Sequence, residues 1–348
     1  MPRPITARSL GMDIGTLPPG PLNAISDIDG VTVGHVTRET GDARTGVTVI
    51  LPHPGNVFRD KVLAASHVIN GFGKSVGLMQ IDELGQIETP IALTNTLSVG
   101  TCATALIKHA IRANPDIGRR TSTVNPVVCE CNDGYLNDIQ GFHVAESDVE
   151  EAIRTAQADF TEGDVGAGKG MSAFELKGGI GAASRRIALD GETYHLGALV
   201  LSNFGRRQQL RIAGRPVGDG RAGSAASESG SVIIVLATDV PLEHRQLRRV
   251  ARRGGVGLCR VGSYLGHGSG DVVVAFTTAN RINHDESRDL LSLGCLNEMR
   301  IDRLFQATAE SVEEAVINSM LAAETVSGFE GHRRESLARL MDRANSLL

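Results

Sequence analysis

The hydrophobic positions of this chain fall into short apolar runs that alternate with stretches of helical periodicity. In the first two thirds of the chain they predict strands at residues 30–36, 46–51, 90–96, 124–131, 176–187 and 197–202, and helices at residues 101–115 and 150–160. The chain is therefore expected to mix α-helices and β-strands.

The last third carries two strongly apolar runs, SVIIVLATD from residue 231 and DVVVAFTTA at residues 271–279. Successive residues are apolar in both runs, so each face of each strand must meet a dry surface. Helices are expected at about residues 243–253, 286–325 and 334–346. One sheet packed against another, with helices outside, would cover both faces of every strand.

A stretch without large apolar side chains precedes the first of these runs. Residues 218–230 read GDGRAGSAASESG, a composition that loses conformational entropy on ordering and buries almost nothing in return. We expect this segment to be mobile. Ser231 then marks the boundary between the mobile segment and a buried strand.

The Gly230-Ser231 dipeptide has two interpretations. Such a pair often ends an ordinary loop before a strand. If the bond between the two residues were cut, Ser231 would carry both a hydroxyl and a free α-amino group, which titrates near ~7.7 to 8.0 and could act as a base. Gly230 has no side chain to obstruct attack on its carbonyl. Cleavage would create a nucleophile and its base together.

Two further polar segments follow or precede apolar runs. The turn GSYLGHGSGD at residues 262–271 places Ser269 two residues before Asp271. Ser231, His267 and Asp271 could form a serine triad, but no G-x-S-x-G elbow accompanies it, and a histidine in a turn is more often solvated. Asn203 closes an apolar run, where its amide could donate to an oxyanion or simply form a turn.

Composition and charge narrow the class of protein. The 348 residues, 41% of them hydrophobic, suffice for one large domain or two ordinary ones. A net charge of -5 argues against nucleic-acid partners, and the basic residues at 245–253 fit one solvated helix face. The start of the sequence lacks a signal-peptide pattern, and no run of about 18 apolar residues could span a membrane. We expect a cytoplasmic protein without membrane contact.

The sequence predicts neither a metal nor a cofactor. Its five cysteines include no C-x-x-C, so reduced thiols are expected, with Cys129 and Cys131 buried on one face of a strand. No histidine pair has H-E-x-x-H spacing. The near phosphate loop GDVGAGKG at residues 163–170 has Gly170 in place of the magnesium-binding hydroxyl, so we interpret it as a glycine-rich turn, followed by a hairpin at residues 174–185.

Ordered blocks of residues carry a family resemblance over nearly the whole chain. They are GTLPPGPLNAISDIDGVTVGHVT (15–37), TLSVGT (96–101), ECNDGYLND (130–138), VGAGKGM, ELKGGIGAASR, LVLSNFG (199–205), the Gly230-Ser231 junction and GHGSGDVVVAFTTAN (266–280). In these blocks the chain resembles the DmpA-type L-aminopeptidase D-esterase/D-amidases, which are related to the β-peptidyl aminopeptidases.

The resemblance implies an α+β fold, a four-layer α-β-β-α sandwich similar to that of N-terminal-nucleophile hydrolases. It implies a single domain, residues 1–348, whose precursor cuts itself into chains 1–230 and 231–348. Ornithine acetyltransferases share the strand connectivity but cut before threonine, so a serine favours the peptidase branch. Members of the family are typically cytoplasmic or periplasmic and form homotetramers of the processed unit.

The resemblance also implies roles for single residues. Ser231 is the expected nucleophile, and its freed amine the base. Ser269 and Asp271 are expected to position that amine or hold the substrate ammonium, Asn203 to donate to the oxyanion, and Tyr135 to line the site. The β-peptidyl aminopeptidases have Glu at the position of Asp271, one methylene longer, which argues against a preference for β-amino substrates.

These observations predict a self-processing serine aminopeptidase that acts on small peptides, amides or esters with a free amino group. Two alternatives remain open from the sequence. One is an aminoacyl transferase on the same scaffold, and the other is a ligand-binding protein that is never cut.

Overall fold

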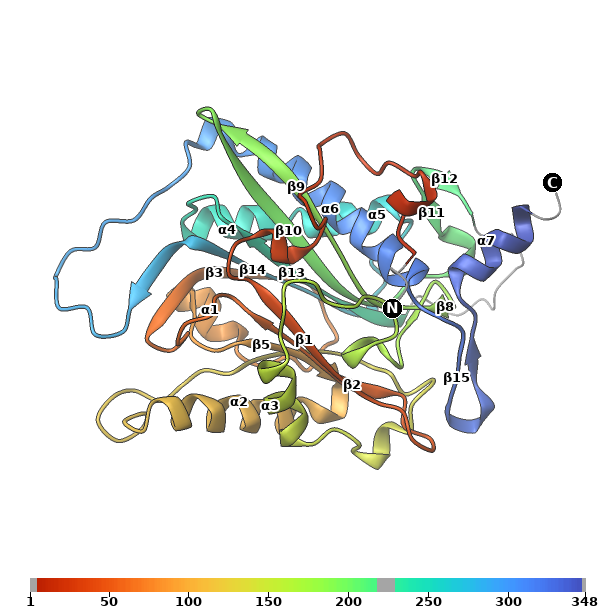
Figure 1. Ribbon diagram of the computed structural model, residues 1–348, viewed down its shortest axis with the longest axis horizontal. Helices are drawn as coiled ribbons and strands as arrows, with labels where there is room; N and C mark the ends of the chain where they lie inside the picture. Colours follow the sequence, from red (N-terminus) through yellow and green to blue (C-terminus); the bar gives the residue numbers. More distant parts are fainter. Residues whose placement is uncertain (1–4, 218–228, 346–348) are drawn as a thin grey trace.

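The computed structural model describes residues 5–217 and 229–345, which form two stacked β-sheets with helices on both outer faces (Figure 1). The four-stranded sheet has the order β1 (Thr32–Arg38), β2 (Thr45–Leu51), β5 (Ile91–Asn95), β6 (Val127–Cys131). The six-stranded sheet has the order β4 (Gln86–Ile87), β3 (Asp60–Gly71), β14 (Gly268–Asn283), β13 (Ser229–Thr238), β10 (Glu192–Asn203), β9 (Gly179–Leu189).

Helices and short hairpins complete the described part of the chain. The helices are α1 (Leu78–Leu84), α2 (Val99–Ala113), α3 (Glu146–Arg154), α4 (His244–Ala251), α5 (Gly254–Arg260), α6 (Asp302–Leu321) and α7 (Leu337–Asn345). The hairpins are β7 (Ser172–Ala173) with β8 (Leu176–Lys177), β11 (Arg211–Ile212) with β12 (Arg215–Pro216), and β15 (Val326–Ser327) with β16 (Arg333–Arg334). No helix of the described residues has both the length and the apolar character needed to cross a bilayer.

Strand β13 shows why the two sheets stack. Its residues Ile233 and Val235 pack in the core between the sheets, whereas Ile234 and Leu236 pack in the core beneath the outer helices. Helices α4 and α6 cover the outer face of the six-stranded sheet, and α2 and α3 cover that of the four-stranded sheet (Figure 1). The predicted four-layer α-β-β-α sandwich is therefore confirmed.

Three predictions of local structure were wrong. The helix expected at residues 150–160 is α3, which ends at Arg154, and residues 286–297 form no helix. Residues 174–185 are not one hairpin, because the tight turn joins β7 to β8 and β9 already begins at Gly179. Of the segment 218–230, predicted to be mobile, residues 218–228 lie outside the described residues, and Ser229 and Gly230 already belong to β13.

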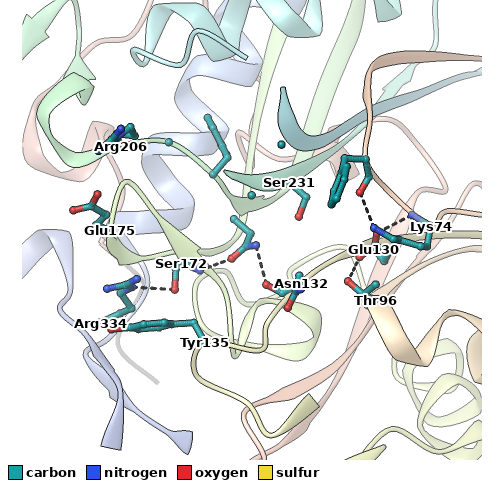
Figure 2. A pocket seen from close by; sticks show the side chains of 16 residues that line it. Lys74, Thr96, Glu130, Asn132, Tyr135, Ser172, Glu175, Arg206, Ser231 and Arg334 are labelled. Atoms are coloured by element: carbon teal, nitrogen blue, oxygen red, sulfur yellow. Dashed lines mark hydrogen bonds between the residues drawn. The ribbon is translucent and has the colours of Figure 1, made fainter. Parts of the chain in front are cut away.

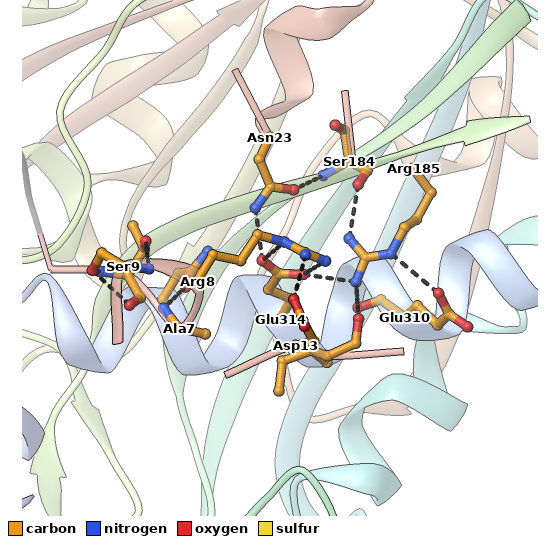
Figure 3. A network of polar contacts seen from close by, with 12 residues as sticks. Ala7, Arg8, Ser9, Asp13, Asn23, Ser184, Arg185, Glu310 and Glu314 are labelled. Carbon is orange, nitrogen blue, oxygen red and sulfur yellow. Dashed lines mark hydrogen bonds and ion pairs between the residues drawn. The ribbon is translucent and has the colours of Figure 1, made fainter. Parts of the chain in front are cut away.

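A buried arginine joins segments that are distant in the sequence (Figure 3). Arg185 of β9 is fully buried and donates from Nε to Glu310 Oε2 at 3.1 Å and from Nη2 to Glu314 Oε2 at 2.7 Å. Arg8 and Asn23, from the N-terminal segment, donate to Glu314 as well. The shared carboxylates of α6 thus hold this helix against both β9 and the N-terminal segment.

Candidate active site

A cavity of about 450 Å³ opens where the ends of several strands meet (Figure 2). In the six-stranded sheet, β13 and β14 begin at this edge, while β10 and β3 end there because they run antiparallel to them. Of the predicted site residues, Gly230, Ser231, Asn203 and Tyr135 line the cavity. The topology therefore brings together residues from distant parts of the chain.

Ser231 lies near the start of β13, paired with Asn203 of β10 and Gly270 of β14. The residue is 4% exposed, and its Oγ meets no hydrogen-bond partner of good geometry among the described residues, with the weakly polar thiol of Cys131 as its polar neighbour. Buried hydroxyls usually have a partner, so an unpaired one in a cavity wall is free to react with a substrate. A Cβ on Gly230 would overlap the backbone of Asn203 and Phe204, so only glycine fits before Ser231.

The side-chain amide of Asn203 is held from both sides. Its Oδ1 accepts from the backbone N–H of Ser172 at 2.9 Å, and its Nδ2 donates to the carbonyl of Asn132 at 2.9 Å. An amide nitrogen carries two hydrogens, so one N–H remains for another acceptor. Asn203 is the register partner of Ser231 and lines the same cavity, so the two side chains leave neighbouring strands at the same point of the sheet.

Ser269 and Asp271 lie on β14, beside the backbone of residues 230–232, and neither lines the cavity. Ser269 Oγ donates to Asp271 Oδ1 at 2.6 Å, and Asn70 Nδ2 donates to Oδ2 at 3.0 Å. Burial raises the pKa of Asp271, and these hydrogen bonds act in the opposite direction. The pair therefore lies beside the β13 backbone on either side of Ser231 and outside the cavity lining.

The alternative triad of Ser231, His267 and Asp271 is not formed. His267 is exposed in the turn before β14 and is not part of the cavity lining. Both carboxylate oxygens of Asp271 are already occupied by other donors. His267 is therefore not placed to act as a base for Ser231.

Tyr135 forms part of the cavity wall in the turn after β6. Its ring is stacked on His332, with centroids 4.4 Å apart, and the Arg334 guanidinium carbon lies 3.7 Å from its centroid. His332 and Arg334 belong to the hairpin segment of β15 and β16, which the sequence did not connect with the site. The C-terminal part of the chain therefore packs against the cavity wall through this hairpin.

Glu130 is a cavity residue that the sequence reasoning missed. It is 3% exposed, and its carboxylate accepts from the backbone N–H of Lys74 at 2.8 Å and from the hydroxyl of Thr96. The prediction concentrated on the flanking thiols, Cys129 and Cys131. An acid inside an apolar strand was the available signal, because carboxylates are rarely buried without a purpose.

Two buried thiols and a glycine-rich turn lie in the same part of the molecule. Cys129 and Cys131 are buried as predicted, and burial raises the pKa of Cys129 to about 12. The segment 163–170 is a close-packed turn, in which a Cβ on Gly168 would overlap the backbone of Gly163 and Ile180. Within residues 5–217 and 229–345, no group of three or more His, Cys, Asp or Glu side chains could hold a metal ion.

Known proteins resemble this chain in both sequence and structure. The model of peptidase family S58 matches residues 23–334. The β-peptidyl aminopeptidase BapA of Sphingosinicella microcystinivorans is 37% identical over 358 aligned positions, covering 95% of this chain and 89% of that protein. A solved structure from Pyrococcus horikoshii OT3 is 52% identical, has a TM-score of 0.92 and covers 98% of this chain and 99% of its own.

A second solved structure bears on the chemistry. It is the L-aminopeptidase D-Ala-esterase/amidase of Ochrobactrum anthropi, described as a prototype for the serine aminopeptidases and a variant of the Ntn hydrolase fold. It is 37% identical to this chain, with a TM-score of 0.91, and the match covers 98% of each chain. The sequence resemblance and the fold therefore agree.

Proposed function

The chain belongs to peptidase family S58 and is a serine aminopeptidase, and we propose that it cuts itself between Gly230 and Ser231 and then attacks its substrates with Ser231. The observation that carries the proposal is the environment of Ser231. Its hydroxyl meets no hydrogen-bond partner of good geometry among the described residues, Asn203 with one unused amide N–H is its register partner, and a Cβ on the preceding residue would overlap backbone. These are the parts that acyl transfer through a serine needs.

Self-cleavage would begin with attack of Ser231 Oγ on the Gly230 carbonyl carbon. The acyl group moves from nitrogen to oxygen, which leaves an ester, and water then hydrolyses that ester. The products are a carboxylate at Gly230 and an α-amino group on Ser231. Ser269 and Asp271 are proposed as positioning residues for this amine, because they lie beside the β13 backbone and outside the cavity.

The same groups would serve catalysis on a substrate. The α-amino group of Ser231 takes the hydroxyl proton, Oγ bonds to the substrate carbonyl carbon, and Asn203 donates to the resulting oxyanion. The ammonium then returns the proton to the leaving amine as the C–N bond breaks. Water releases the acyl group from Oγ in the second half of the reaction.

Glu130 is proposed to bind the free amino group of the substrate. It lines the cavity, and its buried carboxylate has oxygen lone pairs beyond those used by Lys74 and Thr96. Asp271, for which this role was one possibility, does not face the cavity. A buried carboxylate beside the nucleophile favours substrates with an N-terminal ammonium, which means exopeptidase action.

Denaturing gel electrophoresis with N-terminal sequencing tests the proposal. The active protein should give two bands, and the shorter fragment should begin Ser-Val-Ile-Ile. Ser231→Ala should give one uncut and inactive chain. Ser311→Ala is the matched control, because Ser311 Oγ is also buried without a hydrogen bond but lies in α6, away from the cavity, and this variant should be cut and active. An active preparation with one intact band would refute self-cleavage.

We further propose that the processed unit is cytoplasmic and assembles as a homotetramer. The family resemblance supports this, and so does the segment 286–297, which projects from the body of the molecule (Figure 1). Its side chains Leu290, Leu291 and Leu293 are 85%, 45% and 44% exposed, which suits contact with another subunit. Light scattering coupled to size-exclusion chromatography measures the assembly, and a monomeric mass would contradict it.

A further inference from the structure

The cavity around Ser231 has two chemically different ends. In Figure 2, Glu130 and Lys74 lie on one side of Ser231, while Tyr135 and Arg334 lie on the other. If Glu130 binds the substrate ammonium, the acyl part lies between Glu130 and Ser231. The opposite end must then receive the leaving group, because Ser231 attacks the bond between the two parts.

Arg334 is the main cation of the leaving-group end. It is half-buried, its guanidinium covers the Tyr135 ring, and its Nε donates to Ser172 Oγ at 3.2 Å. Among the residues that the structure describes, no carboxylate forms an ion pair with it, and its Nη atoms donate to none of them. A guanidinium has five N–H donors, so four remain for a ligand in the cavity.

The position of Arg334 is set by its surroundings before any substrate binds. Strand β16 pairs with β15, with Arg334 opposite Val326, and the same segment contacts the Tyr135 carbonyl through His332 Nδ1 at 2.8 Å. A planar donor group that is already oriented loses little entropy when it binds an anion. The hairpin therefore presents a preorganised cation to the cavity.

One acid, Glu175, lines the same end of the cavity together with Arg206. Burial lowers the pKa of Arg334 and Glu175 acts in the opposite direction, but an arginine stays protonated throughout. Glu175 is exposed at the rim, so water screens its charge. Arg334 therefore remains the oriented cation at this end of the cavity.

From this arrangement we propose that Arg334 binds the α-carboxylate of the leaving amino acid, which makes dipeptides with a free C-terminus better substrates than their C-terminal amides. The inference rests on the proposed function and adds the substrate class. It assigns Arg334 to specificity and not to bond cleavage. Guanidinium–carboxylate pairs are often bidentate, and they are stronger than hydrogen bonds between neutral groups.

A matched pair of substrates tests the contact directly. With X as the aminoacyl group that the wild-type protein releases fastest from its p-nitroanilide, kcat/KM is measured for X-Gly and for X-Gly-amide. Wild type should prefer X-Gly by about 10-fold or more, the size of a charge-assisted contact. In Arg334→Gln this ratio should fall to about one, mainly through a higher KM for X-Gly, since the contact exists before and during the reaction.

Two other variants separate this role from a structural one. Arg333→Gln removes the neighbouring exposed arginine, which is outside the cavity lining, and should keep the wild-type ratio. Glu175→Gln removes a competing anion and should raise the ratio. Because lost packing on Tyr135 would slow both substrates alike, their ratio isolates the carboxylate contact.

Two results would overturn the inference. One is a wild-type ratio near one, and the other is an Arg334→Gln variant that slows both substrates equally and keeps the ratio. Absence of turnover on every anilide, peptide and amide of the panel would instead overturn the proposed function, and this inference with it.

Discussion

The turn that orients Asn203 contains a buried acid. Asn132 accepts a hydrogen bond from Asn203, and the next residue, Asp133, is wholly buried and accepts from Asn137 Nδ2 at 3.0 Å. Burial raises the pKa of Asp133 to about 7, and the nearby Glu130 acts in the same direction. Near neutral pH this acid is therefore only partly ionised.

Replacing this acid by Asp133→Asn should remove a pH dependence of stability. The native acid keeps its proton up to about pH 7, whereas the unfolded chain releases it near ~3.9. Between these values the native state binds more protons, so the unfolding free energy of wild type falls as pH rises, by at most about 1.4 kcal/mol per pH unit. The variant lacks this slope. In urea unfolding across this pH range, the unfolding free energy of the variant should rise relative to that of wild type as the pH rises. A difference that does not change with pH would contradict the raised pKa of Asp133.

The cysteines should divide into two classes of reactivity. Cys102, Cys129 and Cys131 are buried, and burial raises the pKa of Cys102 and of Cys129 to about 12, whereas Cys259 and Cys295 are exposed. Thiolates are the reactive form, so the buried three should resist modification. A chromogenic thiol reagent should label at most two of the five cysteines in the folded protein and all five in denaturant. Rapid labelling of a third thiol would show that the core opens.

The sequence could assign some single residues to the active site but not others. Ser231 could be predicted because one continuous segment holds the signal, a polar stretch that ends at a buried strand. Glu130 and Arg334 each lie about a hundred residues from Ser231 in the sequence, and no local pattern relates them to it. They become neighbours of the cavity only because β6 and the β15–β16 hairpin end at the same edge of the sandwich.

At the scale of elements, both outer helix layers rest on glycines. On β9, Gly181 faces α6 so closely that a Cβ would overlap the Ala315 carbonyl. On β1, Gly34 faces α3, and a Cβ there would overlap the Ala152 carbonyl. The absence of a side chain lets helix backbone contact sheet backbone. These glycines therefore set how close each helix lies to its sheet.

Gly181→Ala should destabilise the protein by about 1–3 kcal/mol, the usual cost of overpacking, because helix backbone and not a flexible side chain would have to move. Gly100→Ala is the control. Gly100 is an exposed residue of α2 whose Cβ would meet nothing within 4 Å, so alanine should stabilise that helix by up to about 1 kcal/mol. Unfolding midpoints in urea measure both, and equal effects would contradict the close-contact explanation.

The sequence predicted well those elements in which the apolar pattern follows directly from burial. The runs that became β13 and β14 are apolar throughout because both faces are covered. The long strand β3 was missed because polar residues such as Lys61 and Ser66 interrupt its apolar pattern, although both are buried. Residues 286–297 have leucines at helical spacing, but Leu290, Leu291 and Leu293 are exposed in the single chain, so a helix would bury little apolar surface there.

At the scale of the whole molecule, the position of β13 should keep the two products of cleavage together. β13, which would begin the second product, lies between β10 of the first and β14 of the second, and β14 pairs in turn with β3 of the first. Both products therefore contribute to one sheet and to both faces of its packing. They should elute as one species in native size-exclusion chromatography and separate only in denaturant. Separate native peaks would show that the sheet does not hold them.

The network of Figure 3 crosses the same boundary, because Arg185 belongs to residues 1–230 and its carboxylate partners on α6 to residues 231–348. Arg185→Met would remove the positive charge that Glu310 and Glu314 share in a buried site. Removing one partner of a buried ion pair lowers the unfolding free energy by about 3–5 kcal/mol. Measured by urea unfolding in the uncut Ser231→Ala background, this loss should far exceed that of Arg288→Met, whose ion pair with Glu286 is solvent-exposed and screened. If the two variants lost equal stability, the buried carboxylates would have to be neutral or otherwise satisfied, and α6 would be held by its apolar face alone.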